Sequence, residues 1–454
     1  MKKFALLGAL VVLSLLVVFS SCGKKESPVT ATAPAAAEAP KAAAPAPAPA
    51  KPVTVQYWTH EDPARTQLET ELIAKFMADN PHITVVRSTQ ASVKQIELVQ
   101  TAFAANQGPD MFNLPIENQY AYITNQRVAP VDYQAAGYAS KQALLDTYME
   151  NVLDTVTVDG EVYGLPLELT NWSIYLNKKV FRSAGLDPEK DYPKTWEEMA
   201  DISEKLVLRD GDILIRRGFD FRYPYYLTFF VPMVEQLGGE LISADGKKAI
   251  VNDQAWLKAL TYMQQWGPSG RNLGSPTYKN ARNLFNQDNN DIAMAHTGLY
   301  QQGRIEKDNP TFFNSGEWMV IPYPTFKDAV RDVAACYYGH FFMVNADSDP
   351  AVQKAAWKLA GYLLQHGEEY LTRGGNIIQP TKALFESDTL KNMPYSQVFI
   401  DDMARSHMIY YGENSAEIQT QIRYAVESVM LSGVSPEKAL ANLRSAVQEI
   451  VDEQ

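Results

Sequence analysis

The region between residues 53 and 114 limits the possible folds of this chain more than any other, because predicted strands and helices alternate there with short connections. Alternating β-branched and aromatic residues predict a strand at Val53–Trp58, and similar runs predict strands at Ile83–Arg87 and Asp110–Leu114. Apolar residues at helical spacing predict helices at Arg65–Ala78 and Lys94–Ala105. Strands joined through helices in this way pair in parallel, through right-handed crossovers. The region therefore predicts an α/β fold.

Ligands of open α/β sheets bind beyond the carboxyl ends of the strands, so the residues at those ends are candidate site residues. Here they are polar or aromatic: Trp58, Thr59, His60 and Glu61 at the first predicted strand, Thr89 and Gln90 at the second, and Asn113, Glu117 and Asn118 at the third. From these ends we expect Trp58, His60, Glu61, Gln90 and Asn113 to bind a ligand.

Length, charge and cysteine content bound the size of the fold and its partners. About 400 of the 454 residues follow position 53, which is typical of two lobes rather than one small core. The formal net charge of −12 argues against a nucleic-acid or anionic-membrane surface as partner. Cys22 and Cys336 are the two cysteines. If Cys22 carries a lipid, Cys336 has no partner, and disulfides do not stabilise the fold.

The first 22 residues have the features of an export signal. Lys2 and Lys3 precede an uncharged apolar run, Phe4–Phe19, and small residues precede Cys22. We expect a lipoprotein signal peptide at residues 1–22 and a lipid on Cys22, which anchors the exported protein to a membrane, in the periplasm or at the cell surface. An ordinary signal peptide cut near Ser21 and an uncleaved anchor helix are the alternatives. Residues 23–52 are rich in Ala and Pro, which predicts an extended tether.

Common motifs of catalytic, metal and cofactor sites are missing from the sequence. It has no phosphate-binding glycine-rich loop, no GxSxG turn and no CxxC pair. The six histidines are scattered, without the intervals of zinc ligands. We therefore expect no enzyme activity, no metal and no cofactor. A pair of Asp and Glu residues acting as in a glycoside hydrolase is the alternative, although no spacing favours it.

Aromatic and amide residues gather near predicted turns and strand ends. The aromatic candidates are Trp58, Trp172, Tyr223, Tyr300 and Tyr338. A sugar has an apolar C–H face that stacks on a flat ring, and hydroxyls that bind carboxylates, amides and imidazoles. These residue types therefore favour a carbohydrate ligand, with packing in the core as the alternative for each ring.

A set of short segments recurs in a fixed order along the chain. The most specific is Gly185-Leu186 followed by Pro193–Glu198, in which Thr195 and Glu198 predict a helix-capping box. The others are Tyr57-Trp58, Phe76–Pro81, Ile83–Val85, Gly108–Phe112, Val128–Asp132, Gly160–Pro166, Leu176–Phe181, Phe285, Ile292–Met294 with Gly298, Pro322–Pro324 and Ala355–Lys358. In this order they resemble segments of the sugar-type extracellular solute-binding proteins of ABC importers, the maltose-binding-protein-like family. Leu176 departs from the pattern, since that family usually has Tyr there.

The resemblance implies a two-lobed periplasmic-binding-protein fold of the α/β class, each lobe a mostly parallel sheet flanked by helices, joined by a hinge. It places residues 53–164 and about 277–333 in the N-terminal lobe, and about 167–274 and about 338–454 in the C-terminal lobe. The chain is expected to cross between the lobes near Gly164–Leu167, Gly274–Tyr278 and Ala334–Gly339. A ligand between the lobes would shift the hinge equilibrium because it touches both.

The resemblance also implies a function. The chain is expected to be a monomeric substrate-binding lipoprotein that captures a mono- or oligosaccharide in the cleft and delivers it to the permease subunits of an ABC transporter. Near the cleft the resemblance places Glu168, Asn171 and Trp172 after the first crossing, and Tyr338, Gly339 and His340 after the third. Tyr223, His296 and Tyr300 complete the predicted ligand-binding set. The alternatives are a binder of a polyamine, phosphate ester or metal, and a surface enzyme built on the same lobes.

Overall fold

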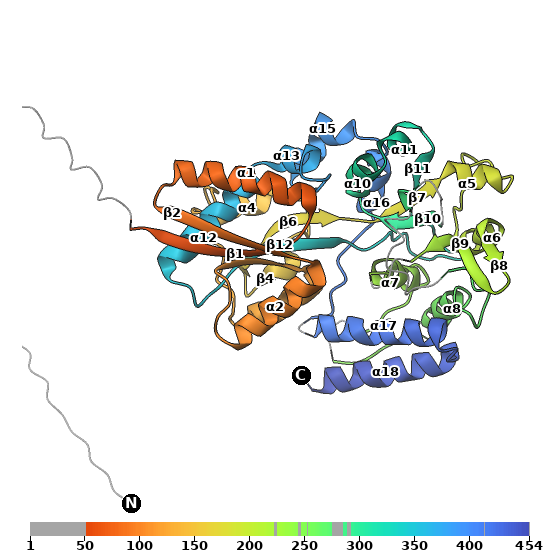
Figure 1. Ribbon diagram of the computed structural model, residues 1–454. Helices are drawn as coiled ribbons and strands as arrows, with labels where there is room; N and C mark the ends of the chain where they lie inside the picture. The colour runs from red at the N-terminus through yellow and green to blue at the C-terminus, as the bar shows by residue number, and fades with distance from the viewer. Residues whose placement is uncertain are drawn as a thin grey trace, which may run out of the picture. The chain divides into compact units, whose positions relative to one another are not determined.

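The computed structural model describes residues 51–221, 225–243, 247–251, 253–274, 285–287, 292–412 and 414–453 (Figure 1). These residues belong to one compact unit that spans 50–454. The predicted signal peptide with Cys22, and almost all of the predicted tether, lie outside the described residues. Within these ranges, no helix has both the length and the apolar character that a membrane span requires.

A five-stranded sheet is the centre of the first lobe. In spatial order its strands are β2 (Ile83–Gln90), β1 (Val53–His60), β3 (Met111–Pro115), β12 (Tyr338–Val344) and β6 (Leu165–Thr170). β1 pairs in parallel with β2 and with β3, so that Val53 lies opposite Ile83 and Tyr57 opposite Met111. β12 pairs antiparallel with both β3 and β6.

Amphipathic helices cover this sheet, and Figure 1 shows α1 and α2 on opposite sides of it. α1 (Pro63–Asp79) begins after Asp62, whose side chain accepts a hydrogen bond from the backbone N–H of Arg65, and it ends before Asn80-Pro81. α2 (Ser92–Ala104) and α12 (Pro350–Leu364) also pack on β1. The smaller elements are η1 (Ile116–Asn118), α3 (Tyr120–Thr124), α4 (Lys141–Thr147), η2 (Asp154–Val156), the hairpin β4 (Thr157–Val158) and β5 (Glu161–Val162), and α13 (Gly367–Thr372).

A second five-stranded sheet is the centre of the second lobe. Its spatial order is β11 (Trp318–Ile321), β7 (Ser173–Asn177), β10 (Ile292–Thr297), β9 (Ile213–Asp220) and β8 (Leu208–Asp210). Alternate residues of β7 face opposite ways: Ile174 and Leu176 enter one hydrophobic core and Tyr175 the other. β7, β10 and β11 are buried throughout, which explains why they are largely apolar, whereas β8 and the first half of β9 are exposed or half-buried and contain arginines.

Helices surround the second sheet. They are α5 (Lys178–Ser183), α6 (Trp196–Leu206), α7 (Leu227–Gln236), α8 (Asp253–Gln264), α10 (Gln301–Asp308), α11 (Pro310–Asn314), α14 (Lys382–Glu386), α15 (Asp388–Lys391), α16 (Ser396–Met403), α17 (Ser415–Leu431) and α18 (Pro436–Asp452). The capping box that the sequence predicts at the start of α6 is confirmed, with Thr195 and Glu198 each bonding the other's backbone N–H. α17 and α18 pack on each other and on α8.

The α/β class is confirmed, but the prediction that each sheet is mostly parallel is wrong in detail. In the first sheet two strand pairs are parallel and two antiparallel, and in the second only β9 and β10 are parallel. The reason is the connectivity. β12 and β7 enter their sheets from the other lobe rather than through a helix of the same lobe, so they run against their neighbours.

The predicted assignment of the later segments to lobes is also wrong. The range 277–333 was expected in the first lobe, yet β10 and β11 pair with β7 in the second sheet. The range 338–454 was expected in the second lobe, yet β12 lies inside the first sheet and α12 packs on it. Strand pairing is a long-range property, so the alternation of residues that reveals a strand does not reveal its partner.

Three crossings connect the lobes and position the site. The chain passes from β6 to β7 through Asn171 and Trp172, and from β11 to β12 through residues 322–337. It returns to the second lobe near α13, where Tyr370 packs in the first lobe's core and Leu371 in a core of the second. The expected crossing at Gly274–Tyr278 is not seen at Gly274, which packs against Phe219 and Trp266 of the second lobe, and the remainder of that range lies outside the described residues.

Candidate functional site

Two adjoining cavities lie between the lobes. The larger has a volume of about 820 Å³ and the smaller about 720 Å³. Ser92 of α2, Tyr225 just before α7 and Tyr338 at the start of β12 line both, so the cavities are two parts of one cleft. Such a volume is in the range of small-molecule sites in proteins.

The larger cavity contains five of the predicted site residues. His60 and Glu61 follow from the end of β1, Glu168 from β6, Tyr300 from the start of α10 and Tyr338 from β12. The wall also carries charged side chains of both signs, namely Asp62, Arg304, Lys307 and Asp308. This part of the cleft therefore presents both donors and acceptors around the rings of Tyr225, Tyr300 and Tyr338.

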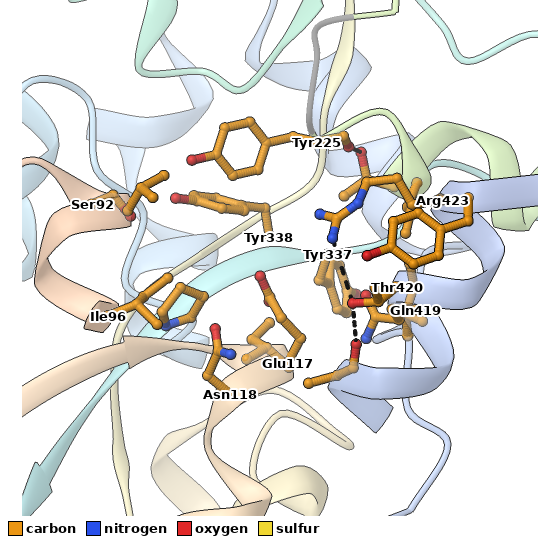
Figure 2. Close-up of a pocket in the computed structure, with 18 of the residues that line it drawn as sticks. Ser92, Ile96, Glu117, Asn118, Tyr225, Tyr337, Tyr338, Gln419, Thr420 and Arg423 are labelled. Atoms are coloured by element: carbon orange, nitrogen blue, oxygen red, sulfur yellow. Dashed lines mark hydrogen bonds between the residues drawn. The ribbon is translucent and has the colours of Figure 1, made fainter. Parts of the chain in front are cut away.

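The smaller cavity lies between η1 of the first lobe and α17 of the second. Figure 2 shows Glu117 and Asn118 on one side, Gln419, Thr420 and Arg423 on the other, and Tyr225 and Tyr338 extending toward Ser92. Burial raises the pKa of Glu117, and Arg423 across the cavity opposes that shift. Glu117 and Asn118 were identified at the end of a predicted strand, whereas the α17 residues were not.

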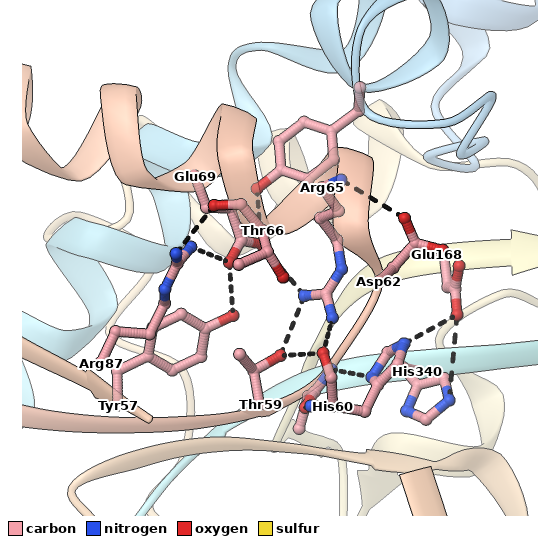
Figure 3. A network of polar contacts seen from close by, with 12 residues as sticks. Tyr57, Thr59, His60, Asp62, Arg65, Thr66, Glu69, Arg87, Glu168 and His340 are labelled. Carbon is pink, nitrogen blue, oxygen red and sulfur yellow. Dashed lines mark hydrogen bonds and ion pairs between the residues drawn. The ribbon is translucent and has the colours of Figure 1, made fainter. Parts of the chain in front are cut away.

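Two stacked histidines and a glutamate form a polar cluster at the wall of the larger cavity (Figure 3): His60 and Glu168 line the cavity, and His340 is buried behind them. The rings of His60 and His340 have centroids 3.9 Å apart and an interplanar angle of 26°. Glu168 Oε1 lies 3.7 Å from His60 Nε2 and 3.8 Å from His340 Nε2. The hydroxyl of Tyr338 lies 3.0 Å from His340 Nε2. We refer to His60, Glu168 and His340 as the His–Glu cluster.

The sheet register places these side chains. His340 lies opposite Glu168 where β12 pairs with β6, and His60 is the last residue of β1. Asn113 of β3 fixes the ring of His60: its side-chain oxygen accepts from the backbone N–H of His60 at 3.3 Å, and its Nδ2 lies 2.9 Å from His60 Nδ1. If Asn113 donates there, His60 carries its proton on Nε2, toward Glu168.

Burial sets the protonation of the His–Glu cluster. It raises the pKa of Glu168 to about 7, opposed by the charge of Arg65. It lowers the pKa of His340 to about 3 and that of His60 well below its usual value, and the charge of Arg65 adds to both shifts. At neutral pH both imidazoles are uncharged. Asn113 contacts His60 Nδ1 and the Tyr338 hydroxyl contacts His340 Nε2, so His60 Nε2 is the ring nitrogen of this pair that a ligand in the cavity can reach.

A buried ionic network supports the end of β1 (Figure 3). The guanidinium of Arg65 donates to Thr59 Oγ1 at 2.9 Å, to Glu69 Oε1 at 3.1 Å and to the backbone carbonyl of His60. Glu69 also accepts from Arg87 at 3.1 Å and from the hydroxyls of Tyr57 and Tyr370 at 3.3 and 3.0 Å. Removing one partner from such a network leaves a buried charge, so it holds His60 and Thr59 in one conformation.

An ion pair connects the lobes beside the larger cavity. Arg304 of α10 lies 3.0 Å from Asp62, the residue that caps α1. The guanidinium of Arg304 also lies over the ring of Tyr300, 5.1 Å from its centroid. Asp62 belongs to the first lobe, and α10 packs with the second through Ile305. The distance between Asp62 and Arg304 therefore increases when the lobes move apart.

Several predicted residues support the cleft wall without lining it. Trp172 is fully buried and packs against the rings of Tyr225 and Tyr338. Gly339 lies so close to β6 that a Cβ would come 2.3 Å from the carbonyl oxygen of Glu168. Asn113 acts through His60, as described above, and the backbone carbonyl of Gln90 accepts from the N–H of Glu61 at 2.6 Å.

Other predictions are not brought to the cleft. Trp58 packs against the core of the first lobe. Asn171 is buried and donates to the carbonyl of Phe399 at 3.1 Å, and His296 is buried among Trp172, Phe219, Phe221 and Phe229. None of these three side chains lines either cavity, because each packs against its own neighbours in the fold. Tyr223 lies outside the described residues.

The His–Glu cluster offers three groups of the kinds that bind metals, with ligand atoms within 4.8 Å of one another. Its geometry opposes a shared ion, because a metal binds an imidazole along the nitrogen lone pair, in the plane of the ring. Two rings inclined by only 26°, with centroids 3.9 Å apart, have planes that do not meet within bonding distance of both. The cluster is suited instead to hydrogen bonds with hydroxyl groups.

A comparison with protein families matches residues 71–394 to a family described as "Bacterial extracellular solute-binding protein". The matched range includes both cavities except for His60 to Ala64 and the residues on and near α17. Among curated proteins, a putative binding protein of Brucella abortus is 22% identical over 305 residues, which cover 65% of this chain and 68% of that protein.

Solved structures share the fold. A solute-binding protein of an ABC transporter from Thermotoga lettingae, bound to α-D-tagatose, has a TM-score of 0.75 at 22% identity, and covers 88% of this chain and 100% of its own. An ABC substrate-binding protein of Listeria monocytogenes in complex with cycloalternan has a TM-score of 0.74 at 20% identity, with the same two coverages. The two-lobed fold is therefore shared with these two proteins.

Proposed function

The chain belongs to the bacterial extracellular solute-binding proteins, and from that premise we propose that it captures a mono- or oligosaccharide in the cleft and delivers it to the permease of an ABC transporter. The observation that carries the proposal is the cleft itself, in which the rings of Tyr225, Tyr300 and Tyr338 lie between the lobes beside His60 and Glu168. The tagatose and cycloalternan bound by proteins of the same fold support the sugar class.

The chemistry of the wall fits a ligand with many hydroxyls. The rings of Tyr225 and Tyr338 offer flat apolar surfaces for the C–H face of a sugar. His60 Nε2 donates, the carboxyl group of Glu168 accepts, and the amides of Asn118 and Gln419 do both. The two adjoining cavities favour an oligosaccharide over a single ring, because a ligand that spans Tyr338 would contact both.

Delivery to a membrane gives the predicted N-terminus a role. We infer a monomer whose signal peptide is removed and whose Cys22 carries a lipid, so that the carrier stays near its importer in the periplasm or at the cell surface. Residues 23–52 would separate the folded part from the bilayer. The protein would act as a passive carrier and leave its ligand unchanged.

Isothermal titration calorimetry with a panel of ligands tests this function. The panel contains mono- and oligosaccharides, a polyamine and a phosphate ester, and the protein is first unfolded and refolded to remove carried ligand. We expect saturable binding of one or a few saccharides, at one site per chain, with no new product by chromatography. Binding of the polyamine or phosphate ester alone would contradict the sugar class, and conversion of a bound saccharide would contradict the passive carrier.

A further inference from the structure

Outside the cleft, Glu235, Cys336 and His407 bring three metal-binding side chains together. Glu235 lies on α7, Cys336 on the segment between β11 and β12, and His407 between α16 and α17. Their ligand atoms all lie within 4.8 Å of one another. None of the three lines either cavity, and the proposed sugar binding does not use them.

The distances in this cluster are close to those around tetrahedral zinc. Cys336 Sγ lies 3.7 Å from His407 Nε2, and Glu235 Oε1 lies 3.1 Å from the same nitrogen. Zinc bonds of about 2.3 Å to sulfur and about 2.0–2.2 Å to nitrogen and oxygen place tetrahedral ligand atoms roughly 3.3–3.6 Å apart. For these two pairs, shifts of a few tenths of an ångström would therefore bring the atoms to that spacing.

Hydrogen bonding alone does not satisfy these three side chains. His407 Nε2 has a single proton or a single lone pair, and it is shared between Cys336 Sγ at 3.7 Å and Glu235 Oε1 at 3.1 Å, so it cannot make a full hydrogen bond to both. The second oxygen of Glu235, Oε2, is buried and has no hydrogen-bond partner among the described residues. A divalent cation would bind the thiolate, the imidazole lone pair and the carboxylate at one point, and this removes the conflict.

We propose that Glu235, Cys336 and His407 form a zinc site on the second lobe, with water as the fourth ligand. The side chains of His407 and Glu235 are 42% and 24% exposed, so the ion and the water can enter from solvent. A sulfur and a nitrogen ligand select zinc over Mg²⁺ and Ca²⁺, which prefer oxygen. Cys336 binds as a thiolate and releases its proton to solvent.

The position of the site gives the ion a structural consequence. The backbone N–H of Cys336 donates to Thr228 of α7 at 2.8 Å, and that of Tyr337 donates to the carbonyl of His407 at 2.8 Å. The ion would tie these three segments together directly before β12 enters the first lobe. It would therefore stiffen one of the crossings about which the lobes move. His407 is 71 residues from Cys336 and 172 residues from Glu235, so the three ligands do not form a local sequence motif.

Titration of the full chain with Co²⁺ after chelation tests the site. Cobalt takes the place of zinc, and its bond to a thiolate gives a sulfur-to-metal charge-transfer absorption in the near ultraviolet. We expect one equivalent of Co²⁺ with this absorption, displacement by Zn²⁺, and no displacement by Mg²⁺. C336S should lose the absorption and bind zinc more than about 100-fold more weakly, and E235Q and H407A should each weaken binding by at least about 10-fold.

Two control variants locate the ion, and circular dichroism confirms that each variant folds. H366A removes a surface histidine that pairs with Glu369 at 2.8 Å without a cysteine nearby, and it should bind zinc normally. H340A removes one member of the His–Glu cluster and should also bind zinc normally. If C336S does not fold, H407A still decides the question, because it changes an exposed side chain. Absence of the absorption, its loss in C22S, or loss of binding in H340A would overturn the proposal.

Discussion

Glu168 is a buried carboxylate whose protonation changes near neutral pH. Its pKa is raised from 4.5 to about 7 by burial, so the folded protein holds a proton there that the unfolded chain has already released. Below about pH 4.5 both states are protonated and the folded state bears no cost. Between 4.5 and 7 stability falls as the pH rises, by roughly 3 kcal/mol in total. This direction is the opposite of that for a carboxylate in a favourable ion pair.

Replacing Glu168 by Gln removes that cost, because the amide stays neutral. We expect E168Q to melt at a higher temperature than the unmodified protein at pH 8, and the difference to shrink toward pH 5. The buried histidines contribute in both proteins, so the difference isolates Glu168. E369Q is the control: His366 lowers the pKa of Glu369, and this exposed residue should not reproduce the trend. Thermal melts from pH 5 to pH 8 measure the difference in melting temperature between the variant and the unmodified protein. A difference that does not change with pH would contradict the raised pKa of Glu168.

Tyr338 lines both cavities, and its hydroxyl forms a hydrogen bond with His340 Nε2. We therefore expect its ring to contact a ligand in either part of the cleft. Y338A should weaken saccharide binding by roughly 1–3 kcal/mol if the ring stacks on the sugar. Y338F keeps the ring and should retain most of that affinity. Trp58 lies away from both cavities, so W58F should bind normally. Calorimetry separates these outcomes, and equal affinity of Y338A and the unmodified protein would remove Tyr338 from the site.

Sequence reasoning reached part of the site at this scale. His60 and Glu61 were predicted because the carboxyl end of a strand is a local feature, and Glu168 and Tyr338 because of the family resemblance. Trp172 and His296 were also predicted in the cleft, but Tyr225 and Tyr338 pack on Trp172, and rings from α7 and β9 pack on His296. Which neighbours cover a side chain depends on packing between distant segments, and the spacing of residues in the sequence does not predict this packing.

At the scale of elements, β12 and β6 form the connection on which the cleft depends. The two strands bring Glu168 and His340 together only because Gly339 allows their backbones to approach. A Cβ at residue 339 would lie 2.3 Å from the Glu168 carbonyl oxygen, so one strand would have to shift. The glycine therefore serves the site through the register of the sheet rather than through a contact with ligand.

G339A should destabilise the protein by roughly 1–3 kcal/mol, the usual cost of overpacking, and should also weaken ligand binding because Glu168 moves. G367A is a matched control at the start of α13, where a new methyl would meet only the flexible side chain of Gln379. Denaturant unfolding gives the stability and calorimetry the affinity. If G339A matched G367A in both measurements, the close approach of the strands would not be required.

Individual elements were easier to predict than their partners. The strands predicted from Val53 and Ile83 begin at those residues, and the predicted capping box of Thr195 and Glu198 starts α6, because the alternation of apolar residues and the capping residues are local features. The assignment of β10, β11 and β12 to lobes failed for the opposite reason. Each of these strands is apolar and buried, so nothing in its own residues distinguishes one sheet from the other.

At the scale of the whole molecule, the ion pair between Asp62 and Arg304 links the lobes across the cleft. The two side chains are 15% and 28% exposed and 3.0 Å apart. A partly exposed pair of this kind contributes about 0.5–1 kcal/mol. Because one partner belongs to each lobe, this energy is gained only when the lobes are close together. The pair therefore favours the closed arrangement before any ligand is bound.

Removing the pair should open the unliganded protein. We expect R304Q and D62N each to shift the ratio of closed to open molecules about two- to fivefold toward open, which small-angle X-ray scattering would detect as a larger radius of gyration. Asn keeps the ability to cap α1, so D62N should not unfold that helix. High salt should have a similar effect on the unmodified protein, because it screens the pair.

Two further variants separate this effect from direct contact with ligand. E97Q breaks the pair between Lys94 and Glu97, which is 3.1 Å long and lies within α2 of the first lobe, so it should leave the radius unchanged. In the double variant D62N/R304Q the change should be no larger than in either single variant, since both remove the same interaction. Additive changes would mean that the residues act independently, and the closed arrangement would then depend on the crossings and the ligand alone.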